Sequence, residues 1–534
     1  MTRNSLERRK VVFGRLASLP VIAFVVVLAL LSAACNNVNL TGEEKGSGTV
    51  SLAIGDVLTK SVRSAGEPLR QTLATGTTYT VKARLSGGHT ADTSITVDSG
   101  NLAGAALSFE GIPVGVTVRL DLEVRAGNNL VWIGSTVDDY TVESGENPLS
   151  VEVGRVSGVL LWKPDVDSGN HNILTAPYGA YDFPADMKIT FDGSSQGTPF
   201  CFDGDGNLYV MSSDAQSALE VKKYDLQPDG TYEDGKTNIQ TNTQVAFNHL
   251  AYDSVADVLY GIGEKVALRC FKTNSQGFDQ VQDNTVNSSS YLGLAAHDNV
   301  VYTIEPGREG SDAVQYATVK SYSISIEGSD AGDTAQSTPK DVKEDSFLLP
   351  SFCTSNYTGQ MIYQDGALYL LLRRLEINDA SNASADNPVE HYSLGALAKI
   401  DPNTLTLDTS FGIGGYLGLS SSPVTFNDRK DSGKTFNVTY HGSTAGNDTF
   451  FGPVGFVAVM PKKLVIGDAG FAMSADGADT TVSLTKKSRV VTVDLETLAF
   501  DATDIDTSYY QSDDNYSSIS NKVRGYSYIV IANN

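Results

Sequence analysis

The chain has 534 residues, a formal net charge of −24 and four cysteines. An acidic surface is repelled by nucleic-acid phosphates and anionic lipid head groups, so we expect no nucleic-acid partner. The cysteines include no Cys-x-x-Cys pair, which argues against a thiolate zinc site. The length exceeds what one hydrophobic core usually organises, so we expect several domains.

The N-terminus combines basic residues with an apolar segment. Five Lys or Arg residues lie within residues 3–15, and an apolar run covers 19–31. A basic start, an apolar core and small residues at its end are typical of an export signal. The run is shorter than the ~20 residues of a spanning helix. We therefore predict an export signal over residues 1–34.

The small residues before Cys35 resemble the cleavage motif of bacterial lipoproteins. Ser32 departs from the usual Leu, and such relaxed motifs are similar to those of spirochaetes. The resemblance implies that Cys35 is lipidated and that acyl chains hold the protein in the cell envelope. Asn36 and Asn37 lack the Asp that retains enteric lipoproteins at the inner membrane, which favours the outer membrane, on its periplasmic or surface face. The alternative is an ordinary signal peptide with an incidental cysteine.

Loss of residues 1–34 would remove five basic residues and one acidic residue, so the formal net charge would change from −24 to −28. We expect residues 35–48, rich in Asn, Gly and Glu, to form a flexible tether.

Alternating apolar and polar residues mark the segment 49–156. In residues 118–124 four apolar residues alternate with three charged ones, which predicts a half-buried strand. The same pattern recurs at 78–85, 93–99 and 149–156. Several short strands separated by Gly, Asn and Asp predict an immunoglobulin-like β-sandwich over 49–156, without the cysteine pair of antibody domains.

A repeated unit distinguishes residues 157–534. Each copy has an apolar strand, a polar turn, a second strand with an apolar–Tyr or Leu-Val pair, and a third strand downstream. The first two strands of the copies cover 200–213, 249–264, 293–307, 361–374 and 456–470. Hexapeptides 400–405 and 493–498 share an apolar residue, Asp, two variable residues and Thr-Leu. Small sheets that pack radially on one another bury both faces, so we predict an all-β chain ending in a six- or seven-bladed β-propeller.

The motif Asp-Gly-x-Leu-Tyr-Val resembles non-enzymatic propeller repeat families, and residues 407–419 resemble the short delta-60 repeat. These resemblances imply a ring with a binding face where loops meet. The stretch of sequence between the repeated pairs at Leu368 and Leu464 is long enough for a further, degenerate blade around 410–418. We also expect the C-terminal strand 526–534 to pair with 158–162 and close the ring.

Asp203, Asp205 and Asn207 occupy alternate positions in residues 200–213, which suits a calcium loop or a hairpin turn. A helix–loop–helix calcium loop needs Gly at its sixth position, where this chain has Leu208. Because the other repeats have turns at this point, we predict a hairpin turn, with calcium as the alternative.

Motifs of catalysis are missing from the sequence. The six histidines are scattered, with no His-Glu-x-x-His, and no nucleophile elbow or phosphate loop occurs. His297-Asp298 falls in a repeat turn. Sialidase-type and quinoprotein propellers rely on tryptophans that recur from repeat to repeat. This chain has only Trp132 and Trp162, which argues against both types. We predict no catalytic residue, no cofactor and no metal.

Cys201, Cys270 and Cys353 are predicted to be buried apolar residues, with at most one disulfide among them. The Tyr-rich segment 506–518 suits protein or sugar recognition, with a solvated loop as the alternative. Segments 327–345 and 376–388 are expected to be insertions.

The hypothesis from the sequence is a non-enzymatic envelope lipoprotein whose propeller face contacts a protein or a glycan. One alternative is a propeller-type glycan hydrolase or lyase with carboxylates in the central channel. Another is a structural envelope component without a discrete ligand.

Overall fold

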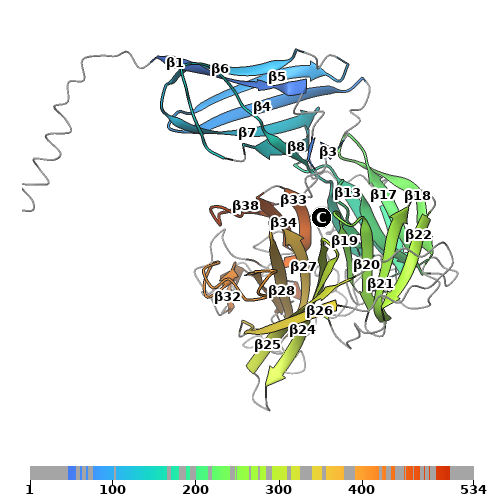
Figure 1. Ribbon diagram of the computed structural model, residues 1–534. Coiled ribbons are helices and arrows are strands. Elements are labelled where there is room, and N and C mark those ends of the chain that lie inside the picture. The colour runs from blue at the N-terminus through green and yellow to red at the C-terminus, as the bar shows by residue number, and fades with distance from the viewer. Residues whose placement is uncertain are drawn as a thin grey trace, which may run out of the picture.

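The computed structural model is an all-β structure of several small, mainly antiparallel sheets (Figure 1), which confirms the predicted class. No described helix is both long and apolar enough for a membrane span. The described residues are 46–55, 61–62, 68–69, 76–100, 104–136, 138–164, 170–179, 188–192, 200–213, 219–240, 247, 249–263, 266–274, 277–283, 291–309, 314–324, 340–350, 357–377, 391–419, 424–427, 435–438, 450, 453–460, 462–468, 474–475, 480–481 and 489–504.

Two sheets make up the N-terminal part, which we call the N-terminal sheets. One has the order β10-β1-β6 and the other β11-β8-β7-β4-β5, with β9 paired to β7. Their strands, with the small hairpin β2–β3, are β1 (Ser47–Ala53), β2 (Ser61–Val62), β3 (Pro68–Leu69), β4 (Thr78–Gly87), β5 (Ala91–Asp98), β6 (Ala106–Pro113), β7 (Thr117–Ala126), β8 (Asn129–Ser135), β9 (Tyr140–Thr141), β10 (Gly145–Pro148) and β11 (Glu152–Arg155).

One core lies between the N-terminal sheets. In β7, Val118, Leu120, Leu122 and Val124 are each at most 2% exposed, and the residues between them face outward. These side chains pack in one cluster with residues of the other sheet, such as Phe109. The alternation predicted for 118–124 is therefore confirmed, because every second residue of the strand faces the opposing sheet.

Within the described residues, six sheets follow in chain order, and we number them sheet 1 to sheet 6. Sheet 1 comprises β12 (Val159–Pro164), β13 (Asn170–Ala176) and β14 (Lys188–Asp192); sheet 2, β15 (Phe200–Phe202), β16 (Leu208–Ser213), β17 (Leu219–Leu226) and β18 (Tyr232–Gln240); sheet 3, β19 (His249–Asp253), β20 (Val258–Gly263), β21 (Val266–Asn274) and β22 (Gly277–Asp283); sheet 4, β23 (Gly293–His297), β24 (Val300–Glu309), β25 (Val314–Ser323) and β26 (Lys340–Leu348); sheet 5, β27 (Tyr357–Gln364), β28 (Ala367–Ile377), β29 (His391–Ile400) and β30 (Tyr416–Leu417); and sheet 6, β33 (Pro453–Met460), β34 (Lys463–Asp468), β37 (Arg489–Asp494) and β38 (Phe500–Asp504). Two hairpins complete the list, β31 (Val424–Asn427) with β32 (Thr435–Val438) and β35 (Ser474–Ala475) with β36 (Thr480–Thr481).

The repeats coincide with sheets 2 to 6. In each of these sheets the first two strands are the predicted hairpin and the third is the predicted downstream strand. The fourth strand was not predicted, because strands such as β26 lie at the outer edge and are polar along most of their length. An edge strand packs on fewer neighbours, so its sequence carries a weaker apolar pattern.

The prediction of a separate degenerate blade around 410–418 is wrong. β30 pairs with β29, with Leu417 opposite Leu397 and Tyr416 opposite Ala398. Tyr416 is 6% exposed and packs in the core between sheets 4 and 5. The segment resembling the delta-60 repeat therefore completes sheet 5, because its buried tyrosine already has a place in that core.

Each described core among sheets 2 to 6 lies between two successive sheets. Leu370 and Leu371 are neighbours in β28, yet Leu370 packs in the core shared with sheet 4 and Leu371 in the core shared with sheet 6. All six residues of β20 are buried for the same reason. These sheets thus have apolar residues on both faces, unlike the single apolar face of β7.

The two ends of this series also meet. The hydroxyl groups of Tyr178 and Thr492 lie 2.9 Å apart, and β12 contacts β33. The predicted closing strand, 526–534, lies outside the described residues. Figure 1 shows the N-terminal sheets, in blue, as a separate body beside the sheets coloured green to red.

Candidate functional site

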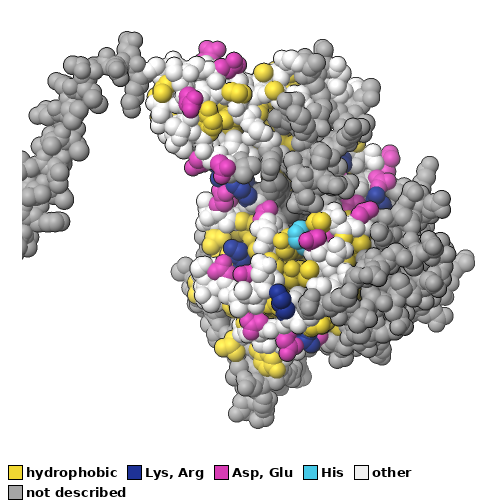
Figure 2. Space-filling view, viewed as in Figure 1, with side chains coloured by type: hydrophobic (Ala, Val, Ile, Leu, Met, Phe, Trp, Pro, Cys, Tyr) yellow, Lys and Arg dark blue, Asp and Glu magenta, His cyan; other side chains and the backbone are white. Residues whose placement is uncertain are grey.

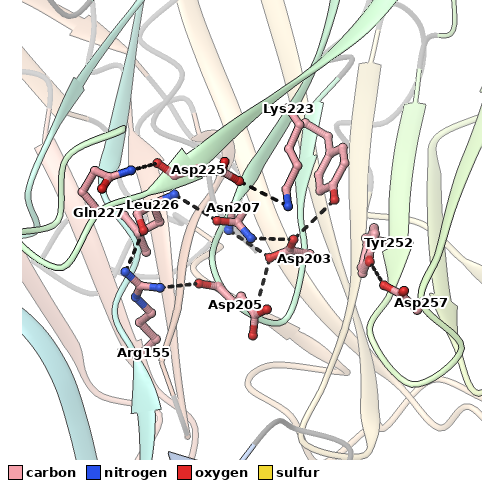
Figure 3. A network of polar contacts seen from close by, with 11 residues as sticks. Arg155, Asp203, Asp205, Asn207, Lys223, Asp225, Leu226, Gln227, Tyr252 and Asp257 are labelled. Atoms are coloured by element: carbon pink, nitrogen blue, oxygen red, sulfur yellow. Dashed lines mark hydrogen bonds and ion pairs between the residues drawn. The ribbon is translucent and has the colours of Figure 1, made fainter. Parts of the chain in front are cut away.

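The turn of sheet 2 is organised around the carboxylate of Asp203 (Figure 3). One of its oxygens accepts hydrogen bonds from the backbone N–H groups of Asp205 and Asn207, both at 2.9 Å. The other accepts from the Asn207 amide at 2.8 Å and from the Tyr209 hydroxyl at 3.4 Å. Asp203 and Asn207 also bond through their backbones, with 3.0 Å between Asp203 N and Asn207 O. The hairpin prediction is confirmed, since β15 and β16 pair antiparallel across this turn.

Burial sets the electrostatics of Asp203. The residue is 6% exposed, and desolvation together with the nearby charge of Asp205 raises its pKa to about 6. The hydrogen bonds from Asn207 and the positive charge of Lys223 act in the opposite direction and lower this pKa. Asp203 is therefore a carboxyl group that changes protonation in mildly acidic solution while it remains inside the fold.

The same carboxylate has limited capacity for a cation. Both oxygens already accept bonds from the turn, and the N–H donors point at the places where calcium would sit. Within the described segments, no group of three or more His, Cys, Asp or Glu residues is placed to hold a metal ion. The arrangement is that of a rigid turn.

Polar side chains link successive hairpin turns from sheet to sheet. Asp253, which ends β19, is fully buried, and its carboxylate accepts from the Val255 and Ala256 N–H groups of its own turn. Its second oxygen accepts from the Asn299 N–H of the next sheet at 2.7 Å. A buried carboxyl group that accepts hydrogen bonds from two turns joins the two sheets at this point.

The link recurs between sheets 5 and 6. Asp365 accepts from the Lys462 N–H at 2.9 Å, and the Gln364 amide donates to the Lys463 carbonyl at 3.0 Å. We call this edge of the six sheets the turn end. In sheets 2 to 6 it contains the hairpin turns after the first strands and the connections after the third strands.

Stacked rings lie beside these polar links. Tyr209 of sheet 2 stacks on Tyr252 of sheet 3, with ring centroids 5.3 Å apart. Tyr302 of sheet 4 stacks on Tyr363 of sheet 5 at 6.3 Å, and His297 lies against the same ring at 3.9 Å. The tyrosine of the repeated pair is thus an inter-sheet contact, and burial raises the pKa of Tyr302 to about 12.

The N-terminal sheets contact the turn end through two arginine side chains, among other contacts. From β11, Arg155 donates to the Leu226 carbonyl at 2.7 Å and to the Asp205 carbonyl at 3.4 Å (Figure 3). From β7, Arg119 lies 2.7 Å from the Glu496 carboxylate. Burial lowers the pKa of Arg155, and the neighbouring Tyr232 partly offsets that shift.

Glu496 also pairs with Lys462 at 2.7 Å, so one exposed carboxylate bridges two cations. These two cations, with Lys462 contributing most, lower the pKa of Glu496. Figure 2 shows basic and acidic side chains side by side where the N-terminal sheets meet the others. The Asn129 amide adds a bond of 2.8 Å to the Asp229 carbonyl.

The two matching hexapeptides fold into the same turn. Asp401 and Asp494 each accept a backbone N–H two residues on, at 2.8 and 3.0 Å. Leu405 and Leu498, the last residues of the hexapeptides, have φ values of 61° and 57°. Glu496 occupies a variable position of this turn, so no repeat signal in the sequence identifies it as a contact residue.

The structure describes two of the four cysteines. Cys201 is half-buried and Cys270 is buried, while Cys35 and Cys353 lie outside the described residues. Burial raises the pKa of the Cys201 thiol well above its usual value. The Tyr-rich segment 506–518 also lies outside the described residues.

Two of the histidines, His249 and His297, have structural contacts. Nε2 of His249 lies 3.1 Å from the Tyr291 carbonyl, and burial lowers the pKa of His249 to about 4. His297 and Asp298 lie in the predicted turn, where Asp298 and Asn299 have φ values of 49° and 59°. Sequence reasoning missed Arg155, Arg119 and Asp253. Asp203 directly follows β15 and Asp253 is the last residue of β19, so a repeated Asp at this point of the hairpin was visible in the sequence.

Comparison with known proteins finds similarity over part of the chain. The family model of the TdpA C-terminal domain matches residues 315–518, from β25 onward and less than half of the sequence. No curated protein matches the chain.

Two solved structures share low similarity. One is a structural genomics protein of unknown function from Bacteroides thetaiotaomicron VPI-5482, with a TM-score of 0.30, 10% identity, and coverage of 79% of this chain and 78% of that one. The other is a GH43_1 enzyme from Xanthomonas citri, with a TM-score of 0.17, 9% identity, and coverage of 44% and 90%. Both TM-scores are too low to establish a shared fold.

Proposed function

We propose that this protein is a non-enzymatic binding scaffold of the cell envelope, in which a β-sandwich and a six-bladed β-propeller follow a lipid anchor. The core shared by the two N-terminal sheets supports the sandwich. Cores between successive sheets and the contact of Tyr178 with Thr492 support a closed ring.

The contact of the N-terminal sheets with the turn end is the observation that carries the proposal. Arg155 and Arg119 bind there, and the inter-sheet bonds of Asp253 and Asp365 use polar groups that a ligand would otherwise meet. The partner, a protein or a glycan, therefore binds the opposite end of the six sheets, where first strands such as β23 begin.

Buried carboxylates favour a scaffold over a glycan hydrolase or lyase. Such an enzyme needs carboxyl groups that meet the substrate. Asp203 and Asp253 instead accept bonds from their own turns, and Asp468 accepts from Arg489. Each of these aspartates has a structural task in the described fold.

Capture followed by hydrogen–deuterium exchange tests the binding function. Fragment 49–534 is immobilised and exposed to envelope extracts and to a glycan array, with heat-denatured fragment as the control. A captured partner should slow amide exchange at the start of β23 and of β27. Slower exchange at Asn299 and Gly366 instead would place the partner on the turn end and contradict the proposal. Absence of specific capture would favour a structural component.

The anchor has a separate test. Metabolic labelling with a palmitate analogue should mark the full chain and leave the Cys35→Ala variant unlabelled. Fractionation of the labelled protein should place it with the outer membrane. Label on the Cys35→Ala variant would contradict the lipoprotein proposal.

A further inference from the structure

Arg269 in β21 is a buried arginine without a counter-ion among the described residues. It is 9% exposed, and its Nε and Nη1 atoms are fully buried without a hydrogen-bond partner. Burial lowers the pKa of its guanidinium group. Burying these two donors without partners is unfavourable, and an acceptor from outside the chain would relieve that cost.

Arg489 is a matched comparison in sheet 6. It also lies in the third strand of its sheet and is 4% exposed. Its Nε and Nη2 atoms lie 3.0 and 2.9 Å from one carboxylate oxygen of Asp468, the residue directly opposite in β34. The fold therefore can supply an internal partner to a buried arginine in the third strand of a sheet.

The residue opposite Arg269 cannot play the part of Asp468. It is Gly261, and a Cβ atom there would lie 2.9 Å from the Phe247 ring. A side chain at position 261 would collide with that ring. The residue opposite Arg269 in the other adjacent strand, β22, is Gln282, so neither neighbouring strand offers the guanidinium group a carboxylate there.

The position of Arg269 defines where an outside partner would enter. Leu268 and Cys270 pack toward sheet 4, whereas Phe271 packs toward sheet 2. Arg269 and Phe271 are two positions apart, so their side chains lie on the same face of β21, the face toward sheet 2. In the register of β20 with β21 it is three residues further from the turn end than Lys272. It therefore lies toward the end opposite the N-terminal sheets.

We propose that Arg269 binds an oxyanion of the ligand, a carboxylate or a phosphate, between sheets 2 and 3 near the end opposite the N-terminal sheets. A guanidinium group offers planar, paired donors that match both groups. The chain carries a net charge of −24, so diffuse attraction of anions is weak and a local donor has to select them. This inference rests on the proposed binding function and names the chemistry of its ligand.

Thermal unfolding of the full chain at constant ionic strength tests the proposal, with sodium glucuronate and sodium phosphate as probes against sodium chloride. One or both anions should raise the Tm of the wild type by on the order of 2 °C or more. A shift with glucuronate alone indicates a carboxylate ligand, and a shift with phosphate alone a phosphorylated one. No shift with either anion would overturn the proposal.

Variants locate the effect. Arg269→Met should abolish the anion shift and unfold at a higher Tm than the wild type in chloride, because it removes an unpaired buried charge. Arg269→Lys keeps the charge without the paired donors and should reduce the shift. Arg489→Met should lower the Tm, because it removes the ion pair with Asp468, and should keep the shift. A destabilised Arg269→Met with an unchanged shift would show that the chain itself satisfies Arg269. Equal capture of an envelope partner by wild type and Arg269→Met would leave the binding function intact and reject this role for Arg269.

Discussion

The N-terminal and C-terminal sheets bury their apolar residues in different ways. Two N-terminal sheets share one core, and strands such as β7 place every second residue in it. Sheets 3, 4 and 5 instead each lie between two cores, and β20 is buried at all six positions. A strand packed on one face shows alternation, whereas a strand packed on both faces shows a continuous apolar run.

The difference also concerns polar groups. A sheet that is buried on both faces exposes mainly its two ends. At the turn end, Asp253 and Asp365 accept hydrogen bonds from the next sheet and so join one sheet to the next. The N-terminal sheets reach this end through Arg119 and Arg155. The two regions thus differ in core and meet through charge.

Alanine substitutions in adjacent residues should separate the two modes of burial most clearly. Leu370→Ala and Leu371→Ala should each lower the free energy of unfolding by about 2–5 kcal/mol, because both faces of β28 are packed. In β4, Leu85→Ala should cost a similar amount, while Lys82→Ala, at an exposed position, should change stability by less than about 0.5 kcal/mol. Urea unfolding followed by fluorescence measures all four. A neutral Leu371→Ala would contradict the two-core description.

Asp203→Asn should change how stability depends on pH. The folded pKa of about 6 exceeds the usual value of ~3.9, so the folded state holds this proton more tightly. The resulting stability is fully present below pH ~4 and is lost as pH rises to about 6, a change of about 3 kcal/mol.

Urea unfolding between pH 4 and 7 should therefore show a steeper decline for the wild type than for Asp203→Asn. Asp298→Asn, at an exposed turn position, is the control and should keep the wild-type slope. Equal slopes for wild type and Asp203→Asn would show that Asp203 titrates normally.

Arg155→Met should weaken the contact between the two regions. It removes charge-assisted bonds to the Leu226 and Asp205 carbonyls, at a cost of about 1.5–3 kcal/mol. Calorimetry should then resolve separate transitions for the N-terminal and C-terminal sheets. Arg84→Met, in a long and exposed ion pair with Asp92, is the control and should leave the thermogram unchanged. A single unaltered transition for Arg155→Met would mean that other contacts couple the regions.

The smallest effect is expected for Glu496→Gln. Its pairs with Arg119 and Lys462 are partly exposed, so the loss should be about 0.2–1 kcal/mol at low salt and should vanish near 1 M NaCl. Because these partners lower the folded pKa of Glu496, its contribution is present above its ordinary pKa and is lost as pH falls. Thermal melts at two salt concentrations measure the difference. A loss that persists at high salt would indicate a packing role instead.

Local signals in the sequence were sufficient for the hairpins. Alternation predicted β7, and the paired apolar and turn residues predicted hairpins such as β19–β20 and β23–β24. Edge strand β26 and the strand β30 were missed, because polar edges and a two-residue strand leave little apolar pattern. The contact residues Arg119, Arg155 and Glu496 had no signal, since surface charges of this kind are common throughout an acidic chain.

By itself the sequence determined the all-β class, the strand–turn–strand units and the turn at Asp203, because these depend on residues within a few positions of one another. Only the tertiary structure decided that segment 410–418 completes sheet 5, which charges join the two regions, and that Arg489 has a partner while Arg269 has none among the described residues. Those facts depend on residues up to hundreds of positions apart, such as Arg119 and Glu496, and packing alone brings them together.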